Sequence, residues 1–159
     1  MSIEELLARV PIFAALNKDQ LAGLARLVVR RSFPRGTVII REGDTEAALY
    51  VIAGGQVSVT KRNLPGSPDL YLATLNPGDF VGEMALLDGA PRSATVTALV
   101  PTECLVLTRW VFNTTLRSDP LIAVAMLPYL SQRIRQAEEV TRKADEVARK
   151  PQTTPLKGP

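Results

Sequence analysis

The sequence predicts a mainly β protein with flanking helices: an antiparallel β-barrel or jelly roll with N-terminal and C-terminal helices. Two observations support this class. Short segments rich in β-branched residues follow one another from Ser32 to Thr108, with turn residues between them. On either side of this stretch, apolar residues recur at helical spacing. The chain has 159 residues, 46% of them hydrophobic, which is enough for one domain with a full core.

The expected strands are short, and most of them alternate between apolar and polar residues. They occupy residues 37–40, 48–52, 57–60, 70–74, 94–98 and 104–107. Glycine, proline, asparagine and aspartate cluster between them, at 34–36, 42–44, 54–55, 63–68 and 76–79. The segment 63–69 contains two prolines, and we expect it to form an insertion-tolerant hairpin tip without a functional role. The β region as a whole is expected to span residues 32–108.

Residues 1–31 are expected to form a helical lead-in. Residues 2–5 (Ser-Ile-Glu-Glu) and 17–20 (Asn-Lys-Asp-Gln) both have the spacing of a capping box, which marks the start of a helix. Pro11 is expected to end the first helix, and the second apolar stripe continues to about Arg30. Core packing explains the apolar residues of both helices.

Helical spacing returns over residues 109–148. Thr108 is expected to cap a short helix whose apolar residues close the base of the barrel: Trp110, Val111, Phe112 and Leu116. Asp119-Pro120 is a good start for the next helix, because proline is favoured at the first helical position. Pro128 falls inside the apolar run that follows, so we expect a kink, or a break between two helices, at that point.

The chain beyond Pro128 carries a heptad spacing of apolar and small residues: Leu130, Ile134, Ala137, Thr141, Ala144 and Ala148. This stripe is short and rich in alanine, so a stable coiled coil on its own is not expected. Residues 149–159 contain three prolines and no apolar pattern, and we expect them to form a disordered tail.

Composition narrows the function classes. The net charge of +3 is modest and both signs are interleaved, which favours a solvated surface over a DNA-binding face. Aromatic residues make up only 5%, which disfavours a stacking platform for single-stranded nucleic acid. The absence of histidine excludes histidine metal centres and imidazole catalysis, and with them the metalloenzymes of the rival cupin architecture. No apolar run approaches the roughly 20 residues of a membrane span.

The single cysteine points to a reducing compartment. Cys104 cannot form an intrachain disulfide, and a cytoplasmic location follows as the expectation. It lies in an alternating apolar strand, where buried packing is its expected role. Glu4 and Glu5 make the N-terminus acidic, unlike a signal peptide. The scattered carboxylates and hydroxyls do not suggest a reaction, so we expect neither an enzyme nor a metal site.

The stretch of residues 80–96 has the chemistry of a pocket for a small anion. Gly82 allows the backbone to come close to a ligand, and residues 83–87 can form one helical turn with free N–H groups. Arg92 offers a planar fork of donors that matches a phosphate, and Ser93 adds a hydroxyl. Glu83 would repel a phosphate, but it could accept hydrogen bonds from a sugar hydroxyl beside that phosphate. A cyclic nucleotide combines both groups.

At these residues the sequence resembles the phosphate-binding cassette of cyclic-nucleotide-binding domains, found in catabolite activators, protein kinase A regulatory subunits and cyclic-nucleotide-regulated channels. The match covers Gly82-Glu83, Pro91-Arg-Ser-Ala94 and the seven positions between them. Turn glycines and the helical lead-in of residues 7–13 also fit the family: Gly36, Gly43-Asp44, Gly55 and Pro77-Gly78-Asp79. The resemblance implies that Glu83 receives the ribose 2′-hydroxyl and that Arg92 holds the exocyclic phosphate oxygens. Ser93 and the amides of Gly82, Met84 and Ala85 would complete the cradle.

The purine base would be held outside the cassette. Its inner wall would come from apolar strand residues, with the choice open among Val51, Ile52, Val57 and Val59. Arg133 falls where some relatives carry a lid arginine that stacks on the base, although a solvated helix arginine is an equally good interpretation. Ser93 is compatible with either nucleotide. We expect cAMP as the ligand, with cGMP as the alternative.

The resemblance implies a regulatory module without catalysis, in which the C-terminal helices act as lid helices and pass the signal on. The alternative is a scaffold of the same fold that does not respond to nucleotide. Family members often dimerise or dock along the C-terminal helix, so a protein partner or a weak homodimer is expected there. The chain ends in a proline-containing tail where catabolite activators continue into a helix-turn-helix, so we expect no nucleic-acid binding by this chain alone. The lack of a membrane span argues against a channel.

Overall fold

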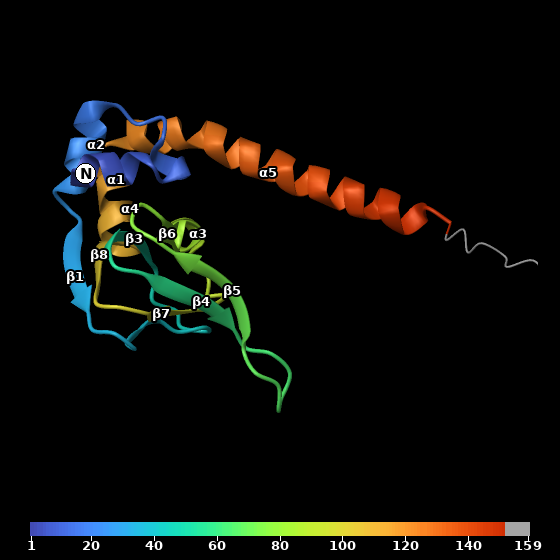
Figure 1. Ribbon diagram of the computed structural model, residues 1–159. Helices are drawn as coiled ribbons and strands as arrows, with labels where there is room; N and C mark the ends of the chain where they lie inside the picture. Colours follow the sequence, from blue (N-terminus) through green and yellow to red (C-terminus); the bar gives the residue numbers. More distant parts are fainter. Residues whose placement is uncertain (152–159) are drawn as a thin grey trace, which may run out of the picture. The chain divides into compact units, whose positions relative to one another are not determined.

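The computed structural model describes residues 1–151, which divide into two units, one from Met1 to Met126 and a second from Leu127 onward. Figure 1 gives the order of the elements along the chain. The predicted disordered tail covers residues 149–159, of which 152–159 lie outside the described residues.

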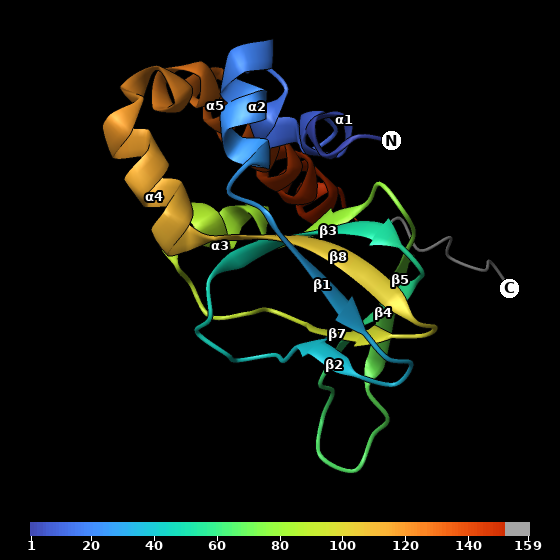
Figure 2. The same cartoon turned by 90° about the vertical axis from the view of Figure 1, so that its left-hand side faces the viewer.

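The first unit is built on two antiparallel four-stranded sheets. One has the order β1 (Val29–Phe33), β8 (Thr102–Thr108), β3 (Ala48–Gly54) and β6 (Phe80–Val81). The other has the order β2 (Val38–Ile40), β7 (Thr95–Ala98), β4 (Val57–Lys61) and β5 (Leu70–Leu75). Neighbours that are distant in sequence, such as β3 and β8, require long crossovers between strands. The predicted jelly-roll class is confirmed: the two sheets form the β region (Figure 2), and helices precede and follow it along the chain.

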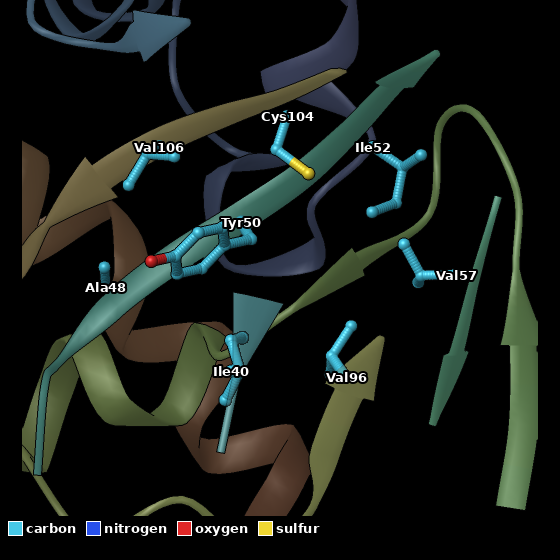
Figure 3. Close-up of a cluster of buried hydrophobic side chains, with 8 residues drawn as sticks. All are labelled: Ile40, Ala48, Tyr50, Ile52, Val57, Val96, Cys104 and Val106. Carbon is cyan, nitrogen blue, oxygen red and sulfur yellow. The ribbon is translucent and has the colours of Figure 1, made fainter. Parts of the chain in front are cut away.

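A buried cluster fills the space between the sheets, and it draws side chains from strands of both (Figure 3). Its members are Ile40, Ala48, Tyr50, Ile52, Val57, Val96, Cys104 and Val106. Because side chains alternate along a strand, Tyr50 and Ile52 of β3 face this cluster, whereas Leu49 and Val51 point to the opposite face. Both faces of β3 are buried.

Cys104 has the packing role that its strand predicted. Its side chain is fully buried inside this cluster. Burial raises the pKa of the thiol to about 11, with a smaller contribution from Glu103. A neutral thiol in an apolar core is chemically quiet.

The N-terminal helices begin where the capping boxes predicted. In α1 (Ile3–Ala8), Ser2 and Glu5 cap each other's backbone N–H groups, and Asn17 and Gln20 do the same for α2 (Lys18–Ala25). A short 3-10 turn, η1 (Pro11–Phe13), separates the two helices.

The second N-terminal helix is shorter than predicted. It ends at Ala25, and strand β1 begins at Val29. The expectation that the helix continues to about Arg30 is therefore wrong. The reason is tertiary pairing. Val29 and Arg30 lie opposite Val106 and Leu105 of β8, and the β-branched pair Val28-Val29 favours a strand.

The first C-terminal helix, α4 (Arg109–Ser118), starts as predicted, with the Thr108 hydroxyl accepting from the Val111 N–H at 3.3 Å. Phe112 is fully buried and its ring centroid lies 6.0 Å from that of Phe13. Trp110, by contrast, is 77% exposed, so the expectation that it closes the barrel base is wrong. Successive helical residues are rotated by about 100°, which places Trp110 on the side opposite Phe112.

The last helix, α5 (Pro120–Arg149), starts at the predicted proline and passes without interruption through Pro128. Of the two expectations at Pro128, a kink or a break between two helices, the break is therefore wrong. Proline removes one backbone donor, but the residues on both sides keep helical geometry. From Ser131 to Arg149 every side chain of α5 is exposed, including the heptad residue Ile134 at 61%. Among the described residues there is no helix both long and apolar enough to cross a bilayer.

Candidate functional site

A cavity of about 400 Å³ opens at the junction of β6, α3 (Glu83–Asp88) and the segment before β7. It is lined by all six residues that the sequence assigned to the cassette: Gly82, Glu83, Met84, Ala85, Arg92 and Ser93. Ile40 and Asp88 also line it. The seventh predicted residue, Arg133, lies on the exposed part of α5 in the second unit.

Gly82 has to be glycine. Its φ is 92°, and it connects β6 to the first turn of α3. A Cβ at this position would lie 2.4 Å from the Ala48 carbonyl oxygen and 2.4 Å from a guanidinium nitrogen of Arg92. The backbone of the cassette therefore packs directly against these groups, which a side chain would push apart.

The helix α3 has six residues, one more than the predicted helical turn over residues 83–87. Ala85 and Leu86 are buried, and Leu86 is fully so, which fixes α3 to the body of the domain. Met84 is 40% exposed. The first amides of this turn, which have no partner within the helix, belong to residues on the cavity wall.

Arg92 is the buried cation of the site. Its side chain is only 8% exposed, and one terminal nitrogen donates to the Ala48 carbonyl at 2.7 Å. The guanidinium carbon lies 5.8 Å from the centroid of the Tyr50 ring, a cation–π geometry. Because both contacts come from β3, the strand holds the charge in place at the cavity, which Arg92 lines.

The backbone of Arg92 is held by a second segment. Its N–H donates to the Asp44 carbonyl at 2.8 Å, and its carbonyl accepts from the Gly43 N–H at 2.8 Å. Gly43 and Asp44 form one of the turns recognised in the sequence. The turn therefore holds the main chain of Arg92 by two hydrogen bonds, and β3 orients its side chain.

Electrostatics at Arg92 are dominated by burial, which lowers the pKa of its guanidinium even though Tyr50, Glu46 and Asp44 act in the opposite direction. Burial also raises the pKa of Tyr50, with a further contribution from Glu46. Burying a cation is costly unless acceptors surround it, and an anion in the cavity can supply such acceptors.

Glu83 and Ser93 both line the cavity, but the two residues differ in their exposure to solvent. Glu83 is half-buried at the first position of α3, and Ser93 is exposed next to Arg92. The cavity therefore combines a carboxylate, a hydroxyl and a buried guanidinium. Such a set can accept from a sugar hydroxyl and donate to a phosphate on one small ligand.

The residues considered for the inner wall lie in the core. Ile52 and Val57 belong to the buried cluster, and Val59 packs against it. Val51 points to the other face of β3. Ile40 belongs both to the cluster and to the cavity lining, and sequence reasoning missed it.

Tyr50 was also missed. It lies 42 positions before Arg92, so no local pattern could pair the two.

The fold and this cavity define a jelly-roll domain with a built-in site for a small anion. Residues 30–119 match the family model described as "Cyclic nucleotide-binding domain". Since the match covers more than half of the chain, the protein belongs to the cyclic nucleotide-binding domain family.

Two relatives and one solved structure illustrate the similarity. The chain is 36% identical over 128 residues to the cyclic AMP receptor protein of Thermus thermophilus, covering 80% of this chain and 59% of that protein. It is 39% identical over 112 residues to a cAMP-dependent protein kinase regulatory subunit of Dictyostelium discoideum, covering 69% of this chain and 34% of that one. The N-terminal domain of a transcriptional regulator from Streptomyces coelicolor A3(2) superposes with a TM-score of 0.78 at 33% identity, covering 84% and 95% of the two chains.

Proposed function

We propose that this chain is a regulatory module that binds cAMP in preference to cGMP and signals through its C-terminal helices. The observation that carries the proposal is the buried Arg92, held by β3 beside Glu83 on one cavity of about 400 Å³. A cyclic nucleotide supplies a phosphate for the guanidinium and a 2′-hydroxyl for the carboxylate. The module carries out no reaction, and its proposed setting is the cytoplasm.

Each cassette residue has a proposed role. Arg92 donates to the exocyclic phosphate oxygens, and Ser93 with the amides of Gly82, Met84 and Ala85 completes the phosphate cradle. Glu83 accepts from the ribose 2′-hydroxyl. Arg133 is the proposed lid residue that stacks on the purine, and Ile40 offers an apolar contact at the cavity wall.

The preference for cAMP is supported by the names of both relatives described above, which include this nucleotide. Ser93 is compatible with it, because a serine hydroxyl can donate to the phosphate. These relatives are longer than this chain, which spans 59% and 34% of their lengths, so their partners and outputs are not transferred.

Isothermal titration calorimetry with cAMP, cGMP and ATP tests the ligand. We expect saturable heat with cAMP, weaker binding of cGMP and none of ATP. If neither cAMP nor cGMP gives heat, the proposal fails and the alternative, a scaffold that does not respond to nucleotide, is favoured. A tighter cGMP isotherm would reverse the preference.

The signalling role needs a separate measurement. Hydrogen exchange of the α5 backbone, followed by mass spectrometry with and without saturating cAMP, should show slower exchange when the ligand is bound. Unchanged exchange over the whole of α5 would contradict signalling through the C-terminal helices. The exposed stripe that includes Ile134 is the surface on which we propose that a protein partner or a second copy docks.

A further inference from the structure

The turn 43–44, which holds the main chain of Arg92, is joined to the cavity segment by a further hydrogen bond next to it. The N–H of Glu42, the residue before this turn, donates to the Thr95 hydroxyl at 3.0 Å. The two bonds between the turn and the Arg92 main chain are 2.8 Å each. Ser93 lies between Arg92 and Thr95, and it lines the cavity together with Arg92. The three bonds therefore support the stretch of backbone that carries the guanidinium and the hydroxyl.

The carboxylate of Glu42 is bound by Arg62, the residue that follows β4. Its oxygen Oε2 accepts from Arg62 Nε at 2.7 Å and from the Arg62 backbone N–H at 3.3 Å. The Glu42 side chain is only 13% exposed, whereas that of Arg62 is 73% exposed. A Cβ placed on Gly43 would lie 3.6 Å from Arg62 Nη2, so the guanidinium lies close to the turn. The hydrogen bond from Arg62 lowers the pKa of the Glu42 carboxyl, which favours its ionised form.

An isolated ion pair on a protein surface contributes little to stability. This pair differs in what its carboxylate residue connects. The ladder between β4 and β7 ends at the pair Thr60 and Thr95, and beyond that pair Glu42 joins Arg62 to the Thr95 hydroxyl. A side chain that binds a ligand has to stay within about 0.5 Å of its productive position. Loss of the contact would therefore loosen the support of Arg92 without removing any group that lines the cavity.

From these contacts we infer that Glu42 and Arg62 are a pair of positioning residues, which fix the backbone at Arg92 and Ser93 and thereby raise the affinity of the cavity for its anion. The inference rests on the proposed function, because a cyclic nucleotide is the anion concerned. Neither member of the pair is among the residues that line the cavity. Both act through the turn 43–44.

The sign of the effect at Glu42 separates positioning from simple electrostatics. Removing a negative charge close to an anion site should strengthen anion binding if charge alone matters. If the pair acts by positioning, Glu42→Gln and Arg62→Met both weaken cAMP binding, by about three- to tenfold each. The double variant should lose little more than the larger single loss, because both changes remove the same contact. Arg62→Lys, which keeps a charged donor, should bind more tightly than Arg62→Met.

Titration calorimetry of the full chain with cAMP measures these affinities, and thermal melting without ligand verifies that each variant folds. Arg30→Met and Glu103→Gln are matched controls, because these two residues also form an exposed ion pair between strands but do not line the cavity. Both controls should bind cAMP like the wild type. Glu42→Gln preserves the shape of the side chain, and Arg62 is exposed, so neither change removes a buried side chain.

Hydrogen exchange of the ligand-free chain gives a second readout, which does not depend on affinity. The amides of Gly43 and Arg92 are both bound across the two segments. In Glu42→Gln and Arg62→Met these amides should exchange faster than in the wild type, whereas in the two control variants their exchange should be unchanged.

Three results overturn the inference. The first is wild-type affinity for cAMP in both Glu42→Gln and Arg62→Met, which leaves the proposed function standing. The second is tighter binding of cAMP by Glu42→Gln, the result that charge alone predicts. The third is the absence of cyclic-nucleotide binding by the wild type, which removes the proposed function together with the inference.

Discussion

The cassette and the exposed part of α5 each carry an arginine that we propose contacts the ligand, and the two side chains are in different physical states. Arg92 is 8% exposed and is held by the Ala48 carbonyl and the Tyr50 ring. Arg133 lies in a stretch where every side chain is exposed. A cation that is already fixed loses little conformational freedom on binding, whereas a solvated one must first be ordered. Affinity should therefore come mainly from the cassette, and α5 should contribute a smaller increment.

The exposed part of α5 uses its charges locally. Arg142 pairs with Glu139 at 2.7 Å, one turn away, and also with Glu146. Such pairs on a helix surface contribute a few tenths of a kcal/mol each and are screened by salt. These ion pairs stabilise the helix, but they do not indicate a ligand-binding site in it. A single substitution should therefore change ligand affinity more in the cassette than in the exposed part of α5. Four variants test this difference.

The largest effect is expected for Arg92→Ala. Removing a buried, charge-assisted donor should weaken cyclic-nucleotide binding by about 3–5 kcal/mol, or two to four orders of magnitude. Titration calorimetry measures it, with Arg35→Ala, which removes an exposed arginine in a turn, as the control for net charge. An affinity within about threefold of wild type would reject the role of Arg92.

Gly82→Ala should cost about 2–3 kcal/mol in binding, because the new Cβ meets the Ala48 carbonyl and the Arg92 guanidinium at 2.4 Å each. Gly66→Ala is the matched control: its φ of 83° is similarly strained, but no atom lies within 4 Å of the added Cβ. Calorimetry and thermal melting of both variants separate crowding at the cavity from backbone strain. Equal affinity losses in the two variants would contradict the close packing at Gly82.

Glu83→Gln should weaken cAMP binding by about 1.5–3 kcal/mol, because a neutral amide accepts less strongly from the ribose hydroxyl. The loss should be smaller for 2′-deoxy-cAMP, which lacks that hydroxyl. The measurement is a double comparison of two proteins with two ligands. An equal loss for both ligands would show that Glu83 does not contact the ribose.

The smallest effect is expected for Arg133→Ala, at about 1–2 kcal/mol from the lost stacking on the base. Arg135→Ala is a suitable control, because residues two positions apart point to nearly opposite sides of a helix. Competition binding with a fluorescent cAMP analogue resolves a difference of this size. If both variants bind like the wild type, Arg133 is a solvated arginine and the affinity belongs to the cassette alone.

Much of the fold could be predicted because its signals are local. The capping boxes at Ser2 and Asn17 act over three residues, and Gly82 to Ser93 form one continuous stretch. The failures had other causes. Val29 and Arg30 fall within the predicted helical stripe but pair with β8, so tertiary contacts overrode the local pattern. Trp110 was grouped with Phe112 by hydrophobicity, although the helical period places them on opposite sides.

The sequence by itself determined the jelly-roll class, the cassette and the chemical character of its ligand, because each depends on residues close together along the chain. Only the tertiary structure decided how Arg92 is held. Its bond to the Ala48 carbonyl spans 44 residues, and the Tyr50 ring beneath it comes from the same distant strand. Burial and orientation depend on contacts between segments that only the fold brings together.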